Sequence, residues 1–131
     1  LYETAKAKGY HPASYISSRA FVWPNVEVGE HCFIFEDNTL QPFVRIGRNV
    51  VLWSGNHIGH HSAVQDHCFI ASHVVISGFC TVGRSTFMGV NATLANNVNI
   101  VCDTKANTLF NGFHPEPARI SGRRFFRVPE D

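Results

Sequence analysis

Residues 46–76, IGRNVVLWSGNHIGHHSAVQDHCFIASHVVI, carry an aliphatic side chain at every sixth position, from Ile46 through Ile58 to Ile76. The same spacing continues without a break in both directions. The fifteen residues of this column are Ile16, Val22, Val28, Ile34, Leu40, Ile46, Leu52, Ile58, Val64, Ile70, Ile76, Val82, Met88, Leu94 and Ile100. A strict short period is typical of a solenoid of stacked repeats, and a period of six predicts a parallel β-helix.

A second column, two residues before the first, holds mostly small side chains. Because side chains alternate between the two faces of a strand, both columns point the same way. Each hexad therefore predicts one short strand followed by a bend, and three hexads close one triangular coil. The fifteen hexads then form about five coils, with no long loop between residues 16 and 100. We expect tight turns at the glycines that follow column residues: Gly29, Gly47, Gly59, Gly83 and Gly89.

The cysteines argue for a reduced interior rather than a disulfide or zinc framework. Cys32, Cys68 and Cys80 all occupy the small column, where a free thiol acts as a small hydrophobic group. Buried reduced cysteines are typical of cytoplasmic proteins, and we expect that location. The net charge of +1 favours neither a nucleic acid nor a membrane surface as a partner.

The 131 residues suit one main domain with short additions at both ends. Residues 1–13 are expected to form a helical cap or the remnant of an upstream domain, with a helix over 2–8 that ends at Gly9. Residues 14–102 form the predicted β-helix. The pattern lapses after Ile100, where Ala106 and Gly112 take the next column positions. Residues 103–131 are therefore expected to form an irregular C-terminal cap with one strand near 124–128.

The aliphatic-Gly-x-x-small-x hexads over residues 14–102 resemble those of the hexapeptide-repeat acyltransferases. The resemblance implies an all-β, left-handed parallel β-helix and a homotrimer that binds acetyl-CoA between neighbouring prisms. Within that group, residues 53–62 and 66–78 resemble the NeuD-type sugar O- and N-acyltransferases. This implies acetyl transfer to a hydroxyl or amine of a sugar or nucleotide sugar, as in polysaccharide biosynthesis. Such proteins usually carry an N-terminal nucleotide-sugar-binding domain, and nothing in this sequence corresponds to it.

The resemblance also implies a catalytic centre in the histidine-rich stretch. It places His60 at the position of the general base, and a histidine suits that role because its pKa lies near working pH. His61 stands where the family often has an acidic neighbour, and His57 is a further candidate helper.

The coenzyme site is expected one coil above His60. There Gly78 would let the thioester arm approach the backbone, with nearby N–H groups facing the thioester carbonyl. We also assign His73, Phe69 and Val90 to coenzyme binding. No metal is expected, and no cysteine is expected to act as a nucleophile.

The hexad frame separates the other histidines, because His61, His67 and His73 lie on three successive corners and cannot share one site within a chain. A γ-class carbonic anhydrase with zinc at a subunit interface is an alternative, since His31, His67 and His73 nearly match its ligand spacing. A structural β-helix without an active site is a third possibility. Arg119, Arg123, Arg124 and Arg127 are expected to form a solvated basic tail rather than a phosphate site.

Overall fold

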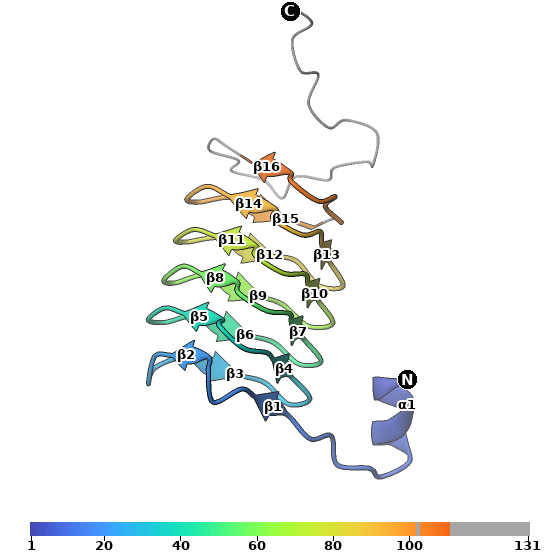
Figure 1. Ribbon diagram of the computed structural model, residues 1–131. Coiled ribbons are helices and arrows are strands. Elements are labelled where there is room, and N and C mark those ends of the chain that lie inside the picture. The colour runs from blue at the N-terminus through green and yellow to red at the C-terminus, as the bar shows by residue number, and fades with distance from the viewer. Residues whose placement is uncertain (102, 111–131) are drawn as a thin grey trace, which may run out of the picture.

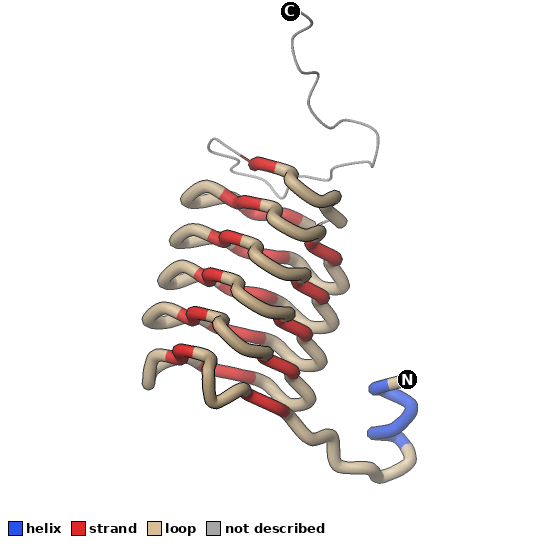
Figure 2. The backbone as a smooth tube through the Cα atoms, viewed as in Figure 1, coloured by secondary structure: helices blue, strands red, loops and turns tan. Residues whose placement is uncertain are grey.

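The computed structural model describes residues 1–101 and 103–110, and it confirms the predicted left-handed parallel β-helix. A short helix, α1 (Tyr2–Ala7), precedes a stack of coils in which two-residue strands alternate with corners (Figure 1). No long loop leaves the stack between residues 16 and 100, as Figure 2 shows. Among the described residues, no helix is long and apolar enough to cross a membrane.

The strands form three parallel sheets, one along each face of the prism. Sheet A contains β1 (Tyr15–Ile16), β4 (Phe33–Ile34), β7 (Val51–Leu52), β10 (Phe69–Ile70) and β13 (Phe87–Met88). Sheet B contains β2 (Phe21–Val22), β5 (Thr39–Leu40), β8 (His57–Ile58), β11 (Val75–Ile76), β14 (Thr93–Leu94) and β16 (Leu109–Phe110). Sheet C contains β3 (Glu27–Val28), β6 (Arg45–Ile46), β9 (Ala63–Val64), β12 (Thr81–Val82) and β15 (Asn99–Ile100).

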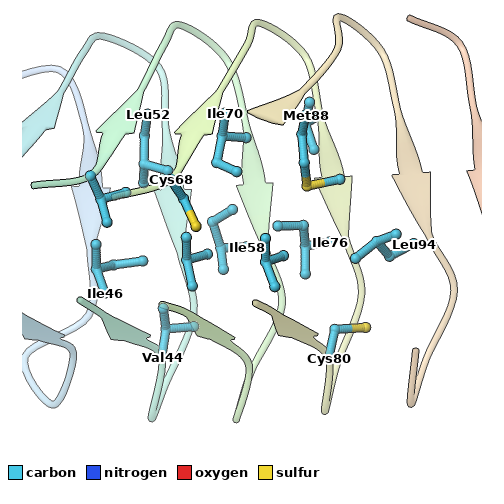
Figure 3. Packing of buried hydrophobic residues seen from close by; sticks show 14 of the residues in the cluster. Val44, Ile46, Leu52, Ile58, Cys68, Ile70, Ile76, Cys80, Met88 and Leu94 are labelled. Atoms are coloured by element: carbon cyan, nitrogen blue, oxygen red, sulfur yellow. The ribbon is translucent and has the colours of Figure 1, made fainter. Parts of the chain in front are cut away.

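The second residue of each strand points inward and stacks on its equivalent in the next coil. Ile34 pairs with Leu52, and Leu52 with Ile70, always one coil apart. Figure 3 shows Leu52, Ile70 and Met88 in one such row. The column residues from Ile34 to Ile100 are all buried. Burial of one such side chain contributes about 1.5–3 kcal/mol, so the rows hold the coils together.

The chain turns at the third residue after each column residue from Val28 to Leu94, where φ lies in the left-handed region. These residues are His31, Asp37, Phe43, Asn49, Gly55, His61, His67, His73, Phe79, Ser85, Asn91 and Asn97. The glycines at the first position after the column play a different role from the one expected. A Cβ at Gly59 would lie 2.5 Å from the carbonyl carbon of Ser77, so this glycine permits close stacking of coils rather than a turn.

The repeat continues beyond Ile100 in place of the expected irregular chain. Thr104 is buried and forms an isolated parallel β-bridge with Met88. Phe110 of β16 pairs with Leu94 of β14. Contacts across this last step join residues sixteen apart rather than eighteen, as between Asn91 and Asn107. The corner after Ile100 is thus two residues shorter, which shifts the hexad frame. The predicted strand near 124–128 and the arginine cluster lie outside the described residues.

Helix α1 lies beside the prism rather than across its end (Figure 1). Its Tyr2 is buried against the corner that joins sheets C and A, where its ring stacks on His31. Ile16, in the first coil, stays 45% exposed. Residues 1–13 therefore cover one side of the β-helix and leave its first coil open. The chain ends the helix close to the expected place, with Gly9 at a φ of 83°.

Candidate active site

His60 and His61 lie together on the corner between β8 and β9. This B–C corner comprises residues 23–26, 41–44, 59–62, 77–80 and 95–98 in successive coils. Buried Ile58 anchors the start of the corner. The backbone N–H of His60 donates to Oε1 of Gln41 at 3.0 Å, and that of His61 donates to the carbonyl of Pro42 at 3.1 Å. The backbone is held firmly while both imidazoles remain exposed to solvent.

The ring of His60 lies directly over Gly78, one coil further along. A Cβ added at Gly78 would lie 2.7 Å from Cε1 and 2.9 Å from Nε2 of His60. Any larger residue at this position would therefore displace the ring. The predicted proximity of His60 and Gly78 is confirmed, and it explains why a glycine stands here although its φ is unexceptional. Their roles in a reaction remain predictions.

The two histidines contact each other, with His60 Nδ1 and His61 Nδ1 3.2 Å apart. The His61 ring is stacked between two phenylalanines from the neighbouring coils. Its centroid lies 4.7 Å from that of Phe43 and 4.9 Å from that of Phe79. This stack was not predicted from the sequence, although Phe43, His61 and Phe79 are one coil apart and each stands three residues after a column residue.

The backbone N–H groups around Gly78 do not face outward as expected. Gly78 donates its N–H to Oδ1 of Asn96 at 2.9 Å, and Phe79 donates to the carbonyl of His60 at 3.0 Å. The N–H groups of Ser77 and Cys80 are also bonded within the chain. The backbone N–H groups of residues 77–80 are therefore not available to a thioester oxygen while these hydrogen bonds are intact.

His57 lies beside the corner, on the outer face of sheet B. It is half-buried in β8, in register with Thr39 and Val75 of the strands on either side. The residue is thus on the flat face that leads to His60, and it takes no part in the contact between His60 and His61.

The other residues assigned to the coenzyme lie elsewhere on the prism. His73 and Val90 stand on the corner between sheets A and B, and Phe69 projects from sheet A. His73 covers Gly55, where an added Cβ would meet its Nδ1 at 2.7 Å. Sheet B separates this group from Gly78, so one chain does not bring the four residues together.

The corner between sheets C and A uses its histidines to hold helix α1. This C–A corner comprises residues 29–32, 47–50, 65–68 and 83–86. Nδ1 of His67 accepts from the side-chain amide of Asn49 at 2.8 Å, and its Nε2 lies 3.4 Å from Oε1 of Glu3. Tyr2 stacks on His31 at 5.3 Å and meets His67 edge-on, while its hydroxyl bonds to Glu30.

The zinc alternative receives no support from this arrangement within one chain. His73 occupies a different corner from His31 and His67, as the hexad frame predicts. In the part of the chain that the structure describes, no three histidine, cysteine or acidic side chains converge as metal ligands.

The three described cysteines are buried and unpaired, as expected from the small column. Burial raises the pKa of all three thiols, and that of Cys68 reaches about 11. A thiol with so high a pKa is a poor nucleophile near neutral pH. The described part of the chain therefore offers the exposed histidines of the B–C corner, rather than a cysteine, for chemistry.

Comparison with known proteins agrees with the fold and with the hexad pattern. Residues 43–78 match the bacterial transferase hexapeptide family, described as six repeats. A histidine-to-asparagine mutant of perosamine N-acetyltransferase from Caulobacter crescentus, in complex with CoA and GDP-perosamine, is similar over 86% of this chain and 55% of its own, at 21% identity and a TM-score of 0.83. PerB from Caulobacter crescentus, in complex with CoA and GDP-perosamine, is similar over 86% of this chain and 56% of its own, at 22% identity and a TM-score of 0.82.

The acetyltransferase domain of PglB from Neisseria gonorrhoeae is similar over 88% of this chain and 57% of its own, at 17% identity and a TM-score of 0.82. The same domain with acetyl coenzyme A bound has a TM-score of 0.73 at 18% identity. None of the curated proteins matches the sequence. The chain spans little more than half the length of these structures. It shares the left-handed β-helix fold of these structures, and residues 43–78 match the repeats of the bacterial transferase hexapeptide family.

Proposed function

We propose that this chain is the β-helix domain of an acetyl-CoA-dependent acetyltransferase that acts on a hydroxyl or amine of a sugar or nucleotide sugar. The observation that supports the proposal is the position of the exposed His60 ring, whose Cε1–Nε2 edge lies against Gly78. Similar structures contain CoA together with GDP-perosamine, and two of them carry a substitution of one histidine, to asparagine or to alanine. This supports a histidine as the base proposed here.

The proposed reaction needs one base and no covalent enzyme intermediate. The acceptor oxygen or nitrogen attacks the thioester carbonyl carbon, and His60 takes the proton that the acceptor loses. The tetrahedral intermediate then collapses, the carbon–sulfur bond breaks, and the CoA thiolate leaves with the proton from His60. The products are free CoA and an acetylated sugar. Donors for the oxyanion must come from outside residues 77–80, whose N–H groups are already used.

We further propose a homotrimer in which sheets A and B pack between subunits. The outer face of sheet A is apolar, with Tyr15, Phe33, Val51, Phe69 and Phe87. Sheet B exposes Phe21, Val75 and Leu109. The outward residues of sheet C are instead the exposed Glu27 and Arg45 and the half-buried Ala63, Thr81 and Asn99. The apolar row along sheet A is a contiguous apolar surface, which marks an interface. Its contact with the different face formed by sheet B gives a ring when the rotation between subunits closes. The cytoplasm, where reduced cysteines persist and nucleotide sugars are made, is the proposed location.

The test is a thiol-release assay with acetyl-CoA and a panel of nucleotide-linked aminosugars. We expect His60→Ala to lower kcat by about 10²- to 10⁴-fold, the usual contribution of a general base. His67→Asn is the matched control, because Asn49 and Asn91 hold the same left-handed corner conformation. The control should keep the wild-type kcat. A His60→Ala variant that is fully active, or wild-type protein that releases no thiol with any acceptor and does not bind acetyl-CoA, would contradict the proposal.

A further inference from the structure

The contact between His60 and His61 restricts the tautomers that the pair can adopt. Two Nδ1 atoms 3.2 Å apart share one proton, since one nitrogen must donate and the other accept. If His60 is to accept a proton at Nε2, its Nδ1 must already carry one. His61 then has to accept at Nδ1 and hold its own proton at Nε2. The geometry thus couples the basic nitrogen of His60 to the tautomer of His61.

No other side chain at this corner is an obvious partner for His60. The described residues of the B–C corner, 23–26, 41–44, 59–62, 77–80 and 95–98, include no aspartate, glutamate, lysine or arginine. The ring contacts of His60 are with His61, Phe79 and Gly78. Among the described residues, the side-chain partner of His60 is therefore an imidazole rather than a carboxylate.

The stack between Phe43 and Phe79 holds His61 in place to receive this hydrogen bond. The ring planes of His61 and its neighbours differ by only 28° and 18°. All three residues share the left-handed backbone, with φ of 63°, 57° and 58°, which aims their side chains along the same line. Stacking on both faces therefore restricts the orientation of the His61 ring.

We propose that His61 is a positioning residue that fixes His60 in the Nδ1-protonated tautomer, so that its Nε2 is free to take the proton of the acceptor sugar. This inference rests on the proposed function for its kinetic consequence only. His61 is not required to touch substrate. When His60 becomes an imidazolium, its Nδ1–H still donates to His61, so the hydrogen bond is kept through the reaction.

The decisive variant is His61→Phe, because phenylalanine already occupies the same corner conformation in the coils on either side. It keeps the aromatic stack and removes only the acceptor nitrogen. We expect kcat to fall about 10- to 100-fold, as when other groups that orient a reactive histidine are removed. The KM for acetyl-CoA and the melting temperature should not change.

A second variant, His61→Asp, supplies a carboxylate acceptor at the same place, and Asp37 shows that this corner conformation suits aspartate. The kcat of this variant should lie within about fivefold of the wild-type value, because the carboxylate accepts the hydrogen bond from His60 in place of the imidazole. The added negative charge stabilises the His60 imidazolium. The acid limb of the pH–rate profile should therefore move to higher pH, by about one unit.

The tautomer itself is read by ¹⁵N NMR of the imidazoles near pH 8, which needs no substrate. We expect His60 to be protonated at Nδ1 in the wild type and mainly at Nε2 in His61→Phe. An unchanged tautomer, or wild-type kcat in His61→Phe, overturns the assignment. If no acceptor is ever acetylated, the proposed function fails while the NMR result still decides the role of His61.

Discussion

The B–C and C–A corners of this β-helix carry the same kind of residue and use it differently. Both place histidines at the third position after a column aliphatic, with φ near 57–62°. At the C–A corner, Tyr2 and Glu3 of helix α1 cover His31 and His67, whose rings hold the helix. At the B–C corner no element covers His60 and His61 in the described part of the chain. Accessibility, rather than residue type or backbone conformation, thus distinguishes the histidines of these two corners.

Among variants that keep every histidine, the largest expected effect comes from separating the subunits, which tests whether the exposed corner is active in a monomer. Phe87 on sheet A is 45% exposed, and its ring stacks on that of Phe69. Phe87→Glu would place a charge in the proposed apolar interface, which is costly to bury. We expect a monomer by light scattering, with acetyl transfer reduced at least about 100-fold, the scale of a lost positioning contact.

The matched control is Thr81→Glu, which changes an outward residue of polar sheet C. This variant should remain trimeric and active. A monomeric wild type, or a Phe87→Glu trimer with unchanged activity, would refute the proposed packing of sheets A and B.

The next effect disturbs the exposed corner without changing a histidine. Gly78→Ala adds a methyl group 2.7 Å from Cε1 of His60, so the ring must move aside. Because the ring is the end of a side chain, the fold should tolerate the shift, while displacement of a base by about 1 Å reduces the rate roughly 100-fold. Steady-state kinetics and thermal melting measure the two consequences. Normal kcat in Gly78→Ala would show that the position of the His60 ring is unimportant.

The smallest effect concerns the covered corner and depends on pH. Lys6 and Tyr2 donate to the carboxylate of Glu30, and these hydrogen bonds lower its pKa below 4.5. A lowered pKa in the folded state means that the stabilisation is present above pH 4.5. It is lost as the pH falls through the lowered pKa.

We therefore expect helix α1 to lose its docking in this acidic range before the β-helix unfolds. Amide hydrogen exchange of residues 2–7 and 34–100, measured from pH 7 to pH 3, follows the two regions separately. Glu30→Gln should weaken the protection of residues 2–7 already at pH 7, without an effect on acetyl transfer. Uniform exchange behaviour of helix and coils across the titration would contradict this separation.

Much of the candidate site could be predicted from the eighteen-residue period of one coil. It predicted that Gly78 lies next to His60 and that His67 and His73 face other directions, because stacked coils bring residues one turn apart into contact. The period did not predict that Oδ1 of Asn96 accepts a hydrogen bond from the N–H of Gly78. The side chain of a polar corner residue has several possible partners. The shortened corner before Thr104 was also missed, because a two-residue deletion breaks the period without removing the strand.

The sequence alone determined the solenoid, because an unbroken aliphatic column leaves only a stacked interior in which to bury those side chains. The same column placed Cys32, Cys68 and Cys80 inside. Only the tertiary structure decided which corner histidines stay accessible. That outcome depends on helix α1 docking against one corner and not the other, and on the approach of two adjacent rings. Neither contact recurs from coil to coil, so the repeat pattern of the sequence cannot predict it.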